Sequence, residues 1–309
     1  MTELSPTCLL CEEKSLTTVD EIHSSDITLL YKNSFGVEVD RLFRTKTIQF
    51  QKCQSCDLRF FNPPVVGDEQ FYHDMQRFTW YYQADKPEYH FVASMIGDTD
   101  QVLDIGCGKG LFANIVGPGR YVGLDSSPKA QEQARLAGIR VELGTIQQHA
   151  LLHKGKYDVV CGFQVLEHVD GINGFIASSV ECLRAGGLLI YSVPSEDSFL
   201  SQSSNATTNL PPHHVSRWTD KALERIGELF SLNLLQIHHD EVSKEHLSSY
   251  GQTVVVQRLM ALLGKQFRLV NMSLLNRIMN KVGWVLGPIA VSKKTSAMGH
   301  TVTIVLQKR

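Results

Sequence analysis

A glycine-rich turn between two acidic residues is the part of this chain best suited to holding a small ligand. Residues 102–110 read V-L-D-I-G-C-G-K-G, an apolar run that leads into a glycine turn. Glycine is needed there because a side chain would keep the backbone away from the ligand. Asp125 ends the next apolar run, 21 residues after Asp104, which is the spacing of an acid that meets ribose hydroxyls. The turn lacks the third glycine position of a dinucleotide fingerprint, so a ligand without a pyrophosphate fits better.

Two pairs of cysteines have the spacing of a metal site. Cys8 and Cys11 form one C-x2-C pair, and Cys53 and Cys56 form another. Two such pairs can supply four thiolates in tetrahedral geometry, and with no ligand position left open they predict a closed structural zinc site. A rubredoxin-like iron site and four unliganded thiols are the alternatives. The isolated cysteines are predicted to be small core residues: Cys107, Cys161 and Cys182.

Histidines near two predicted strand ends are candidates for acid–base catalysis, because the pKa of histidine lies near neutrality. His213 and His214 follow two prolines in the stretch P-P-H-H-V-S. His214 is the first candidate for a general base and His213 the second, and their alternative role is to pack beside Trp218. His168 is a third candidate, and its alternative role is to order its loop together with Glu167.

Apolar runs and helix signals alternate along the middle of the chain. Strands are predicted at 101–105, 121–124, 141–143, 157–162, 188–193, 232–238 and 300–306. Helices are predicted at 111–116, 128–137, 172–183 and 219–230. This alternation is typical of an α/β fold with a mostly parallel sheet. The glycine turn, Asp125 and the histidines all follow strands, so the loop side of that sheet is expected to hold the ligand.

The remaining segments extend the chain beyond this core. The predicted parts are a zinc-binding head (1–62), a connector with a first helix (63–90), the core (91–240 and 298–309) and a helical insertion (241–297). Between its cysteine pairs, the head contains short β-rich runs at 28–31 and 47–51. They are expected to form a small sheet between the two cysteine turns.

Four motifs in this order resemble class I S-adenosylmethionine-dependent methyltransferases. They are D-I-G-C-G-K-G at 104–110, G-L-D at 123–125, Y-D-V-V leading into Q-V-L-E-H within 157–168, and L-R-A-G-G-L-L-I-Y-S-V-P at 183–194. The resemblance covers residues 85–240 and the last strand. It implies a Rossmann-like, seven-stranded, mostly parallel sheet with helices on both faces. A small zinc-ribbon-like N-terminal domain and a helical insertion before the last strand would be added to it.

The resemblance also implies which residues bind S-adenosylmethionine. They are Asp104, Gly106, Cys107, Gly108, Asp125, Ser126, Thr145, Ile146 and Gln164. Asp104 would order the glycine turn and meet the cofactor's amino group, Asp125 would hold the ribose, and Gln164 would line the methyl-transfer site. Relatives usually end their third strand with an acid that contacts adenine. This chain has G-T-I at 144–146 instead, so the backbone of Thr145 and Ile146 is expected to contact the base. Taken alone, Asp104 could merely cap the turn, and Asp125 the helix that follows.

The methyl acceptor can be narrowed by the same resemblance. The head and the P-P-H-H-V-S stretch resemble enzymes that methylate nucleotide-linked sugars, polysaccharides and secondary metabolites, in which a histidine serves as base. The Q-V-L-E-H motif at 164–168 lacks the Asp/Asn-Pro-Pro-aromatic signature of amine-directed methyltransferases, which favours an oxygen or carbon acceptor. The prediction is therefore methylation of a sugar hydroxyl, or of a sugar carbon, in polysaccharide or related biosynthesis. An RNA methyltransferase and a non-catalytic cofactor-binding or scaffold protein are the alternatives.

Charge is unevenly distributed along the chain. Residues 246–309 hold nine basic residues and no Asp or Glu, so within a net charge of −2 the first 245 residues carry −11. An acidic main body argues against a nucleic-acid partner. The basic and apolar insertion is expected to form a lid or a homodimer face, or to meet an anionic membrane or lipid-linked substrate. Because no secretory signal or bilayer-spanning run is present, the expected location is cytoplasmic, peripheral at the membrane if the insertion binds there.

Overall fold

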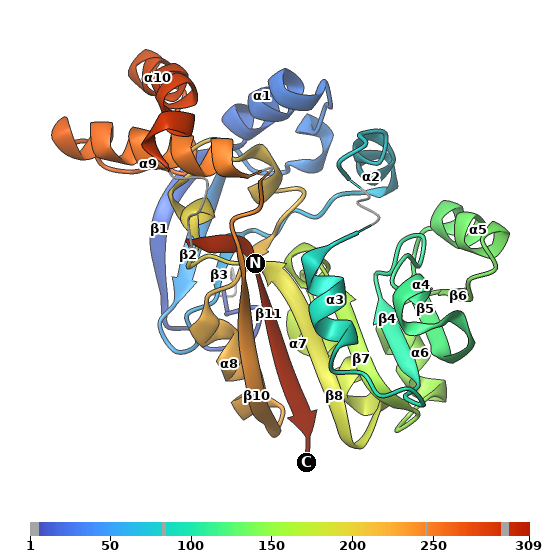
Figure 1. Cartoon of the computed structure of the whole chain (residues 1–309). Helices are drawn as coiled ribbons and strands as arrows, with labels where there is room; N and C mark the ends of the chain where they lie inside the picture. The colour runs from blue at the N-terminus through green and yellow to red at the C-terminus, as the bar shows by residue number, and fades with distance from the viewer. Residues whose placement is uncertain (1–5, 82–84, 245, 292–296) are drawn as a thin grey trace.

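The computed structural model describes residues 6–81, 85–244, 246–291 and 297–309 (Figure 1). Its largest element is a seven-stranded sheet with the order β10-β11-β8-β7-β4-β5-β6. The strands are β4 (Val102–Ile105), β5 (Tyr121–Asp125), β6 (Val141–Leu143), β7 (Tyr157–Phe163), β8 (Leu183–Pro194), β10 (Leu232–Glu241) and β11 (Met298–Lys308). Only β11 runs antiparallel to its neighbours, β8 and β10, whereas the other neighbouring pairs are parallel. The predicted α/β fold with a mostly parallel seven-stranded sheet is confirmed.

Helices cover both faces of this sheet (Figure 1). On one face pack α3 (Pro87–Ala93), α4 (Ala113–Val116) and α5 (Pro128–Leu136), and on the other α6 (Ile146–Leu152), α7 (Ile172–Cys182) and α8 (Asp220–Leu229). Successive side chains of a strand point to opposite faces. Val102 of β4 therefore joins the buried cluster that contains Phe112, while its neighbour Leu103 joins the cluster that contains Ile176. Burial on both faces explains why the central strands read as continuous apolar runs.

A second, four-stranded sheet has the order β1-β2-β3-β9 and runs antiparallel throughout. Its first three strands, β1 (Leu16–His23), β2 (Thr47–Cys53) and β3 (Arg59–Asn62), belong to the N-terminal part of the chain. The fourth, β9 (Ser216–Arg217), comes from the long loop after β8. A single turn, η1 (Asp40–Leu42), and the short helix α2 (Glu69–Met75) complete this part of the chain. The small sheet is therefore built from two distant segments of sequence.

One of the two β-rich runs predicted in the N-terminal head is wrong. The β-rich run at 47–51 lies in β2, as expected, but the run at 28–31 lies in helix α1 (Ser24–Phe35). Ile27, Leu30 and Tyr31 recur at helical spacing and are buried on one side of that helix. The helix ends where Gly36 adopts a left-handed conformation, with φ at 65°. Helical periodicity over the longer window outweighs the local β propensity of Thr28 and its neighbours.

Buried charges join the small sheet to the large one. The carboxylate of Glu196, in the loop after β8, lies 2.8 Å from Nη1 of Arg59 and 2.6 Å from Nε of Arg217. The side chains of Glu196 and Arg217 are only 2% and 3% exposed. Breaking one partner of a buried pair leaves an uncompensated charge, which is costly. The segment between Glu196 and Arg217, which carries P-P-H-H-V-S, is thus fixed at both ends to the junction of the two sheets.

The predicted helical insertion forms a hairpin of two helices, α9 (Leu247–Leu262) and α10 (Leu274–Ala290) (Figure 1). The helices cross closely at glycines: a Cβ atom added to Gly251 would lie 2.3 Å from the carbonyl oxygen of Gly287. The loop between them buries Leu269 and Val270 in the apolar cluster around Tyr31. Among the described residues, no helix has the length and apolar character needed to cross a bilayer.

Candidate active site

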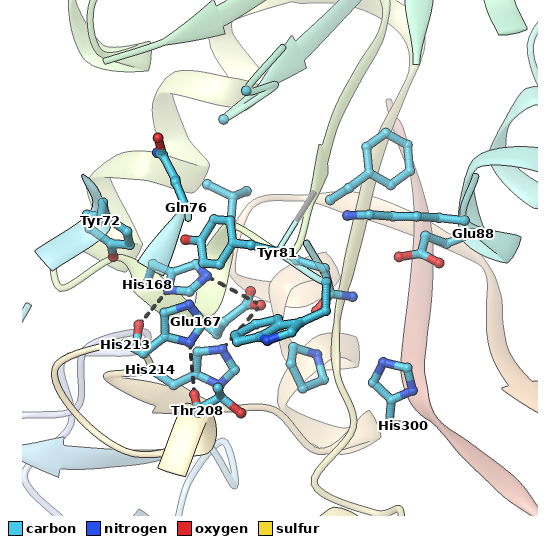
Figure 2. Close-up of a pocket in the computed structure, with 18 of the residues that line it drawn as sticks. Tyr72, Gln76, Tyr81, Glu88, Glu167, His168, Thr208, His213, His214 and His300 are labelled. Carbon is cyan, nitrogen blue, oxygen red and sulfur yellow. Dashed lines mark hydrogen bonds and ion pairs between the residues drawn. The ribbon is translucent and has the colours of Figure 1, made fainter. Parts of the chain in front are cut away.

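A cavity of about 1820 Å³ lies at the carboxyl edge of the parallel strands. Its wall is formed by the turns after β4, β5 and β7, by parts of α2 and α3, and by the loop between β8 and β9 (Figure 2). The predicted residues that line it are Asp104, Gly106, Cys107, Gly108, Asp125, Ser126, Gln164, His168, His213 and His214. The structure thus brings the predicted cofactor residues and the predicted bases into one cavity, as expected for ligands of a parallel sheet.

The glycine turn after β4 has a backbone that other residues rarely adopt. Gly106, Gly108 and Gly110 have φ values of 67°, 54° and 71°. A Cβ atom on Gly106 would also lie 2.6 Å from Cγ2 of Val165, in the turn that follows β7. Glycine at this position therefore allows both the left-handed conformation and the close approach of the two turns.

Asp104 is 2% exposed and lies beneath this turn. Its Oδ2 accepts a hydrogen bond of 2.7 Å from the hydroxyl of Tyr121. Among the described residues, its Oδ1 has no hydrogen-bond partner, and burial raises the pKa of this carboxyl to about 7. Because an unpartnered buried oxygen is costly, this atom fits a cationic or hydrogen-bonding group of a ligand in the cavity.

Asp125, at the end of β5, holds the glycine turn in place. Its Oδ2 accepts a hydrogen bond of 2.8 Å from the amide of Gly108, and its Oδ1 accepts one of 2.8 Å from the amide of Ser127. The helix that follows is capped by the hydroxyl of Ser127, which accepts from the amide of Ala130. Asp125 is therefore not the cap of α5, and each of its oxygens keeps a lone pair for a ligand hydroxyl.

Thr145 and Ile146 are the two predicted cofactor residues that are not among the described residues lining the cavity. Thr145 begins α6 as its N-cap: its hydroxyl accepts from the amide of Gln148, and its own amide donates to the side-chain oxygen of Gln148. This capping box already engages the Thr145 amide. A contact from this pair to adenine stays a prediction, and nearby Ser126 and Lys129 do line the cavity.

The turn after β7 carries the carboxylate and the first histidine of a buried cluster. Gln164 has a φ of 55° and lines the cavity, and Glu167 and His168 belong to the short helix η3 (Leu166–His168). The amide of Val215, immediately after His214, donates 2.8 Å to the carbonyl of Glu167. Two segments that lie far apart in the sequence are thereby held side by side.

Three histidines meet at this junction (Figure 2). Nδ1 of His213 donates to the carbonyl of Thr208 at 2.9 Å, and Nδ1 of His214 donates to Oδ1 of Asn209 at 3.0 Å. Nδ1 of His168 donates to the carbonyl of His213. The ring centroids of the three histidines are 4.6–4.9 Å apart. All three predicted bases therefore form one group rather than acting as alternatives at separate places.

Burial shifts every ionisable group of this cluster toward its uncharged form. It lowers the pKa of His168 to about 4, against carbonyls of His213 and Gln164 that raise it, and the pKa of His213 to about 3. It also holds the pKa of His214 well below the usual range. The pKa of Glu167 is raised by burial to about 8. The imidazoles are therefore neutral near pH 7 and keep their lone pairs.

Several residues of this wall carry no recognisable sequence signal. Asn209 and Thr208 orient the two histidines, and Tyr72 and Tyr81 pack against the ring of His213. Glu88 of α3 is buried beside the cavity, and burial raises the pKa of its carboxyl. Only the aromatic richness of residues 71–89 could have indicated that this connector forms part of a binding site.

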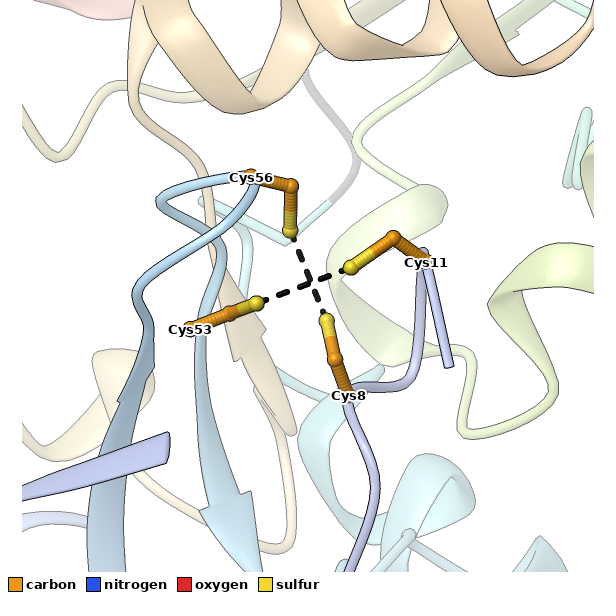
Figure 3. A group of neighbouring side chains, drawn as sticks. All are labelled: Cys8, Cys11, Cys53 and Cys56. Atoms are coloured by element: carbon orange, nitrogen blue, oxygen red, sulfur yellow. Dashed lines mark hydrogen bonds between the residues drawn. The ribbon is translucent and has the colours of Figure 1, made fainter. Parts of the chain in front are cut away.

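The four paired cysteines form a second cluster (Figure 3). The Sγ atoms of Cys8 and Cys56 are 3.5 Å apart, those of Cys11 and Cys53 are 3.6 Å apart, and all four lie within 4.8 Å of one another. Sulfurs about 2.3 Å from a tetrahedral ion lie about 3.8 Å apart, so this group could hold a metal ion. The hydrogen bond between the thiols of Cys8 and Cys56 lowers the pKa of Cys8 and raises that of Cys56, so one sulfur of the pair takes the thiolate form, which binds metals, more readily than the other.

Comparison with known proteins identifies the class of this domain. The model of a family described as a methyltransferase domain matches residues 74–237, which include the glycine turn, Asp125 and all three histidines. This span is more than half of the chain, so the chain belongs to this methyltransferase family. Its α/β part is a class I S-adenosylmethionine-dependent methyltransferase domain, as the sequence motifs indicated.

Curated relatives match only part of the chain. A ubiquinone biosynthesis O-methyltransferase of Thiobacillus denitrificans is 35% identical over 100 residues, 30% of this chain and 43% of that protein. An uncharacterised protein encoded in a transposon of Streptomyces fradiae is 37% identical over 129 residues, 38% of this chain and 35% of that protein. The chain thus spans less than half the length of these relatives. A crystallised S-adenosylmethionine-dependent methyltransferase of Thermotoga maritima has a TM-score of 0.51 at 17% identity, covering 78% of this chain and 98% of that one, which shows the shared fold.

Proposed function

We propose that this protein transfers a methyl group from S-adenosylmethionine to a hydroxyl oxygen of a small-molecule or glycan acceptor. One observation carries the proposal: the glycine turn and the histidine cluster share a single cavity, and Gly106 of the first abuts Val165, two residues before Glu167. Methyl transfer requires a cofactor site and a proton-accepting site within one enclosed space. The name of several relatives, ubiquinone biosynthesis O-methyltransferase, supports oxygen as the atom that is methylated.

The residues at the turn fit the cofactor, which supplies an electrophilic methyl group on its sulfonium when bound. Asp125 would hold the ribose hydroxyls through the lone pairs that Gly108 and Ser127 leave free. Asp104 would order the turn and accept from the amino group through its unpartnered Oδ1. Gln164 and Val165 would then place the methyl group toward the histidines.

A hydroxyl acceptor must lose its proton as the new bond forms, and the histidine cluster is placed to promote this loss. Nδ1 of His214 is committed to Asn209, so its Nε2 carries the free lone pair. Oε1 of Glu167 lies 3.9 Å from this Nε2, so a proton taken up by the ring and ionisation of the Glu167 carboxyl would stabilise each other. His214 is therefore the base we propose, with His213 and His168 supporting it. A sugar hydroxyl is the acceptor that the P-P-H-H-V-S resemblance favours.

We further propose that the four cysteines bind structural zinc. Both cysteine turns repeat one geometry, since Glu12 and Asp57, each just after the second cysteine of a pair, are left-handed with φ near 62° and 66°. The first turn is fixed to the core, because the carbonyl of Leu10 accepts from the side chain of Asn173. With all four ligand positions taken by sulfur, the ion would have no open position for chemistry.

Labelled S-adenosylmethionine added to extract of the source cells tests the proposed reaction. We expect label in the fraction of small molecules, sugar nucleotides and glycans. His214→Ala should lower the rate about 100-fold or more, the usual size of a general-base contribution, while cofactor affinity stays unchanged. His153→Ala, at the C-cap of α6 and outside the cavity, is the matched control and should keep full activity. Label in RNA or protein, or none despite cofactor binding, would overturn this acceptor assignment.

The hairpin of α9 and α10 suggests where the reaction takes place, and we propose that it rests on an anionic lipid surface. Large apolar side chains of α10 are open to solvent, among them Trp284 at 69% and Ile289 at 81% exposure. All charged residues of residues 246–309 are basic, and Arg258, Arg277 and Lys281 are exposed around these apolar groups. Basic, apolar helix surfaces of this kind lie in the interface of anionic membranes.

Cosedimentation with lipid vesicles tests this surface. Each basic residue near an anionic membrane contributes about 1 kcal/mol, so replacing Arg258, Arg277 and Lys281 by alanine should weaken binding to phosphatidylglycerol vesicles about 100-fold. The same change at three exposed basic residues of the core, Arg135, Arg140 and Lys154, should leave binding nearly unchanged. Equal binding of the wild type to neutral vesicles, or a dimer formed through this hairpin, would count against the proposal.

A further inference from the structure

The three histidines beside the cavity lie together and share one pattern of ring hydrogen bonds (Figure 2). In each ring, Nδ1 donates to an oxygen of the segment between β8 and β9. A carbonyl oxygen only accepts, so each Nδ1 carries the ring proton and each Nε2 keeps its lone pair. A fixed Nδ1–H bond to an oxygen is also the usual second contact of a histidine that binds metal through Nε2.

Two of the free nitrogens lie near one carboxyl group. Oε1 of Glu167 is 3.8 Å from Nε2 of His168 and 3.9 Å from Nε2 of His214. One ring nitrogen from each of the three histidines can be chosen so that all lie within 4.8 Å of one another. Ligand atoms about 2.1 Å from a shared ion lie about 3.0–3.4 Å apart. Side-chain movements of about 1 Å would therefore bring these ring nitrogens to the distances needed to bind one ion.

Polar atoms at this place lack partners in the described part of the protein. Neither oxygen of Glu167 accepts a hydrogen bond there, and Nε2 of His213 makes none, although these residues are 1% and 7% exposed. Arg217, the buried cation on the following strand, is already paired with Glu196 at 2.6 Å. A buried carboxylate and a buried imidazole nitrogen without partners are costly, and a bound cation would satisfy both.

We propose that His168, His213 and His214 bind one divalent transition-metal ion at the acceptor end of the cavity, with the carboxylate of Glu167 beside it. Imidazole nitrogens favour Zn²⁺, Fe²⁺, Co²⁺ and Ni²⁺ over Mg²⁺ or Ca²⁺. Three neutral rings and one carboxylate would leave the site with a net positive charge. All four residues line the cavity, so the remaining coordination position faces the space that an acceptor enters.

This ion would act on the acceptor hydroxyl, an inference that rests on the proposed methyl transfer. Binding of a hydroxyl oxygen to a divalent cation lowers its pKa, as it does for water. The proton would leave to water in the open cavity. The oxygen would then form its bond to the methyl carbon, while the carbon–sulfur bond breaks and leaves its electron pair on sulfur. With the ion in place, the histidines would serve as its ligands, and His214 would act through the ion instead of taking up the proton itself.

Metal content tests the site independently of activity. The full chain is stripped with a chelator, incubated with excess Zn²⁺, passed through a desalting column and analysed for zinc. The His213→Ala/His214→Ala variant should hold one ion fewer per chain than the wild type. Glu167→Gln, which keeps the size of the side chain, should weaken Zn²⁺ binding about 10-fold or more, because an anionic group beside the ion is lost. Unchanged S-adenosylmethionine affinity would show that these variants are folded.

Cobalt substitution separates this ion from one held by the cysteines. Co²⁺ bound to thiolates absorbs by charge transfer from sulfur, whereas Co²⁺ bound to nitrogen and oxygen does not. The His213→Ala/His214→Ala variant should keep the full sulfur charge-transfer absorption while binding one Co²⁺ fewer per chain. His153→Ala is the control, since Glu142, His149 and His153 form another group of ligands. Equal metal content in wild type and His213→Ala/His214→Ala would overturn the metal site and leave the proposed methyl transfer standing. Loss of the second ion only in His153→Ala would do the same. Two bound ions without any methyl transfer would overturn the proposed function alone.

Discussion

Replacing Asp125 by alanine is expected to weaken S-adenosylmethionine binding by about 100-fold to 20,000-fold. Hydrogen bonds to a charged group contribute about 1.5–3 kcal/mol each, and every 1.4 kcal/mol is a factor of ten in affinity. Asp125 would supply two such bonds to the ribose. It also holds the amides of Gly108 and Ser127 at 2.8 Å, so the turn itself would lose its shape. Titration calorimetry with S-adenosylmethionine and with S-adenosylhomocysteine measures the effect.

Asp158 provides a matched control for this change. Its carboxylate also accepts a hydrogen bond from a backbone amide, that of Gln101 at 2.7 Å, and it pairs with Arg184. It lies at the start of β7, at the edge of the sheet opposite the cavity. Asp158→Ala should therefore cost some stability but leave cofactor affinity within a few-fold of the wild type. Equal affinity of Asp125→Ala and wild type would show that the cofactor does not bind at this turn.

The sequence allowed the large sheet to be predicted because its strands are marked locally. The strand predicted at 121–124 is β5 (Tyr121–Asp125), and that at 141–143 is β6 (Val141–Leu143), since each apolar run is bounded by glycine or a polar turn. Helix α1 was misread because Thr28–Tyr31 alone favours a strand and only its longer window shows helical spacing. Strand β9, two residues long, has no periodicity of its own and exists because β3 offers it an edge.

Candidate site residues could be predicted from the sequence where they lie in short motifs at the ends of strands. Asp104 and Asp125 occupy positions fixed by their strands, so their convergence on the glycine turn follows from a parallel sheet. The histidine cluster depends instead on contacts between remote segments, such as the amide of Val215 on the carbonyl of Glu167. Sequence reasoning therefore named His168, His213 and His214 as rival bases. Only the folded structure shows that the three histidines form one cluster and that Asn209 orients His214.

The cysteine cluster should control the acceptor side of the site more than the cofactor side. Cys53 and Cys56 flank the turn between β2 and β3, and β3 pairs with β9, three residues after His213. The amide of Phe61 in β3 donates 3.0 Å to the carbonyl of Val215. Any loss of order in the small sheet would thus reach the histidines directly. The glycine turn is held mainly by β4 and β5 in the large sheet, so a change in the small sheet reaches it less directly, through the buried cluster that Cys53 and Leu103 share.

We therefore expect Cys53→Ser/Cys56→Ser to lose zinc and at least 100-fold in turnover, while S-adenosylmethionine affinity changes by only a few-fold. Structural zinc contributes about 10–16 kcal/mol to the folding of small zinc domains, and a displacement of about 1 Å at a catalytic group can cost 100-fold in rate. Cys182→Ala, a buried cysteine of α7 outside the cluster, is the control and should retain zinc and turnover. Metal analysis, calorimetry and the methyl-transfer rate on the same preparations separate the two sides. Loss of cofactor binding together with turnover would mean that the whole chain unfolds as one unit. Full turnover without zinc would show that the small sheet does not position the histidines.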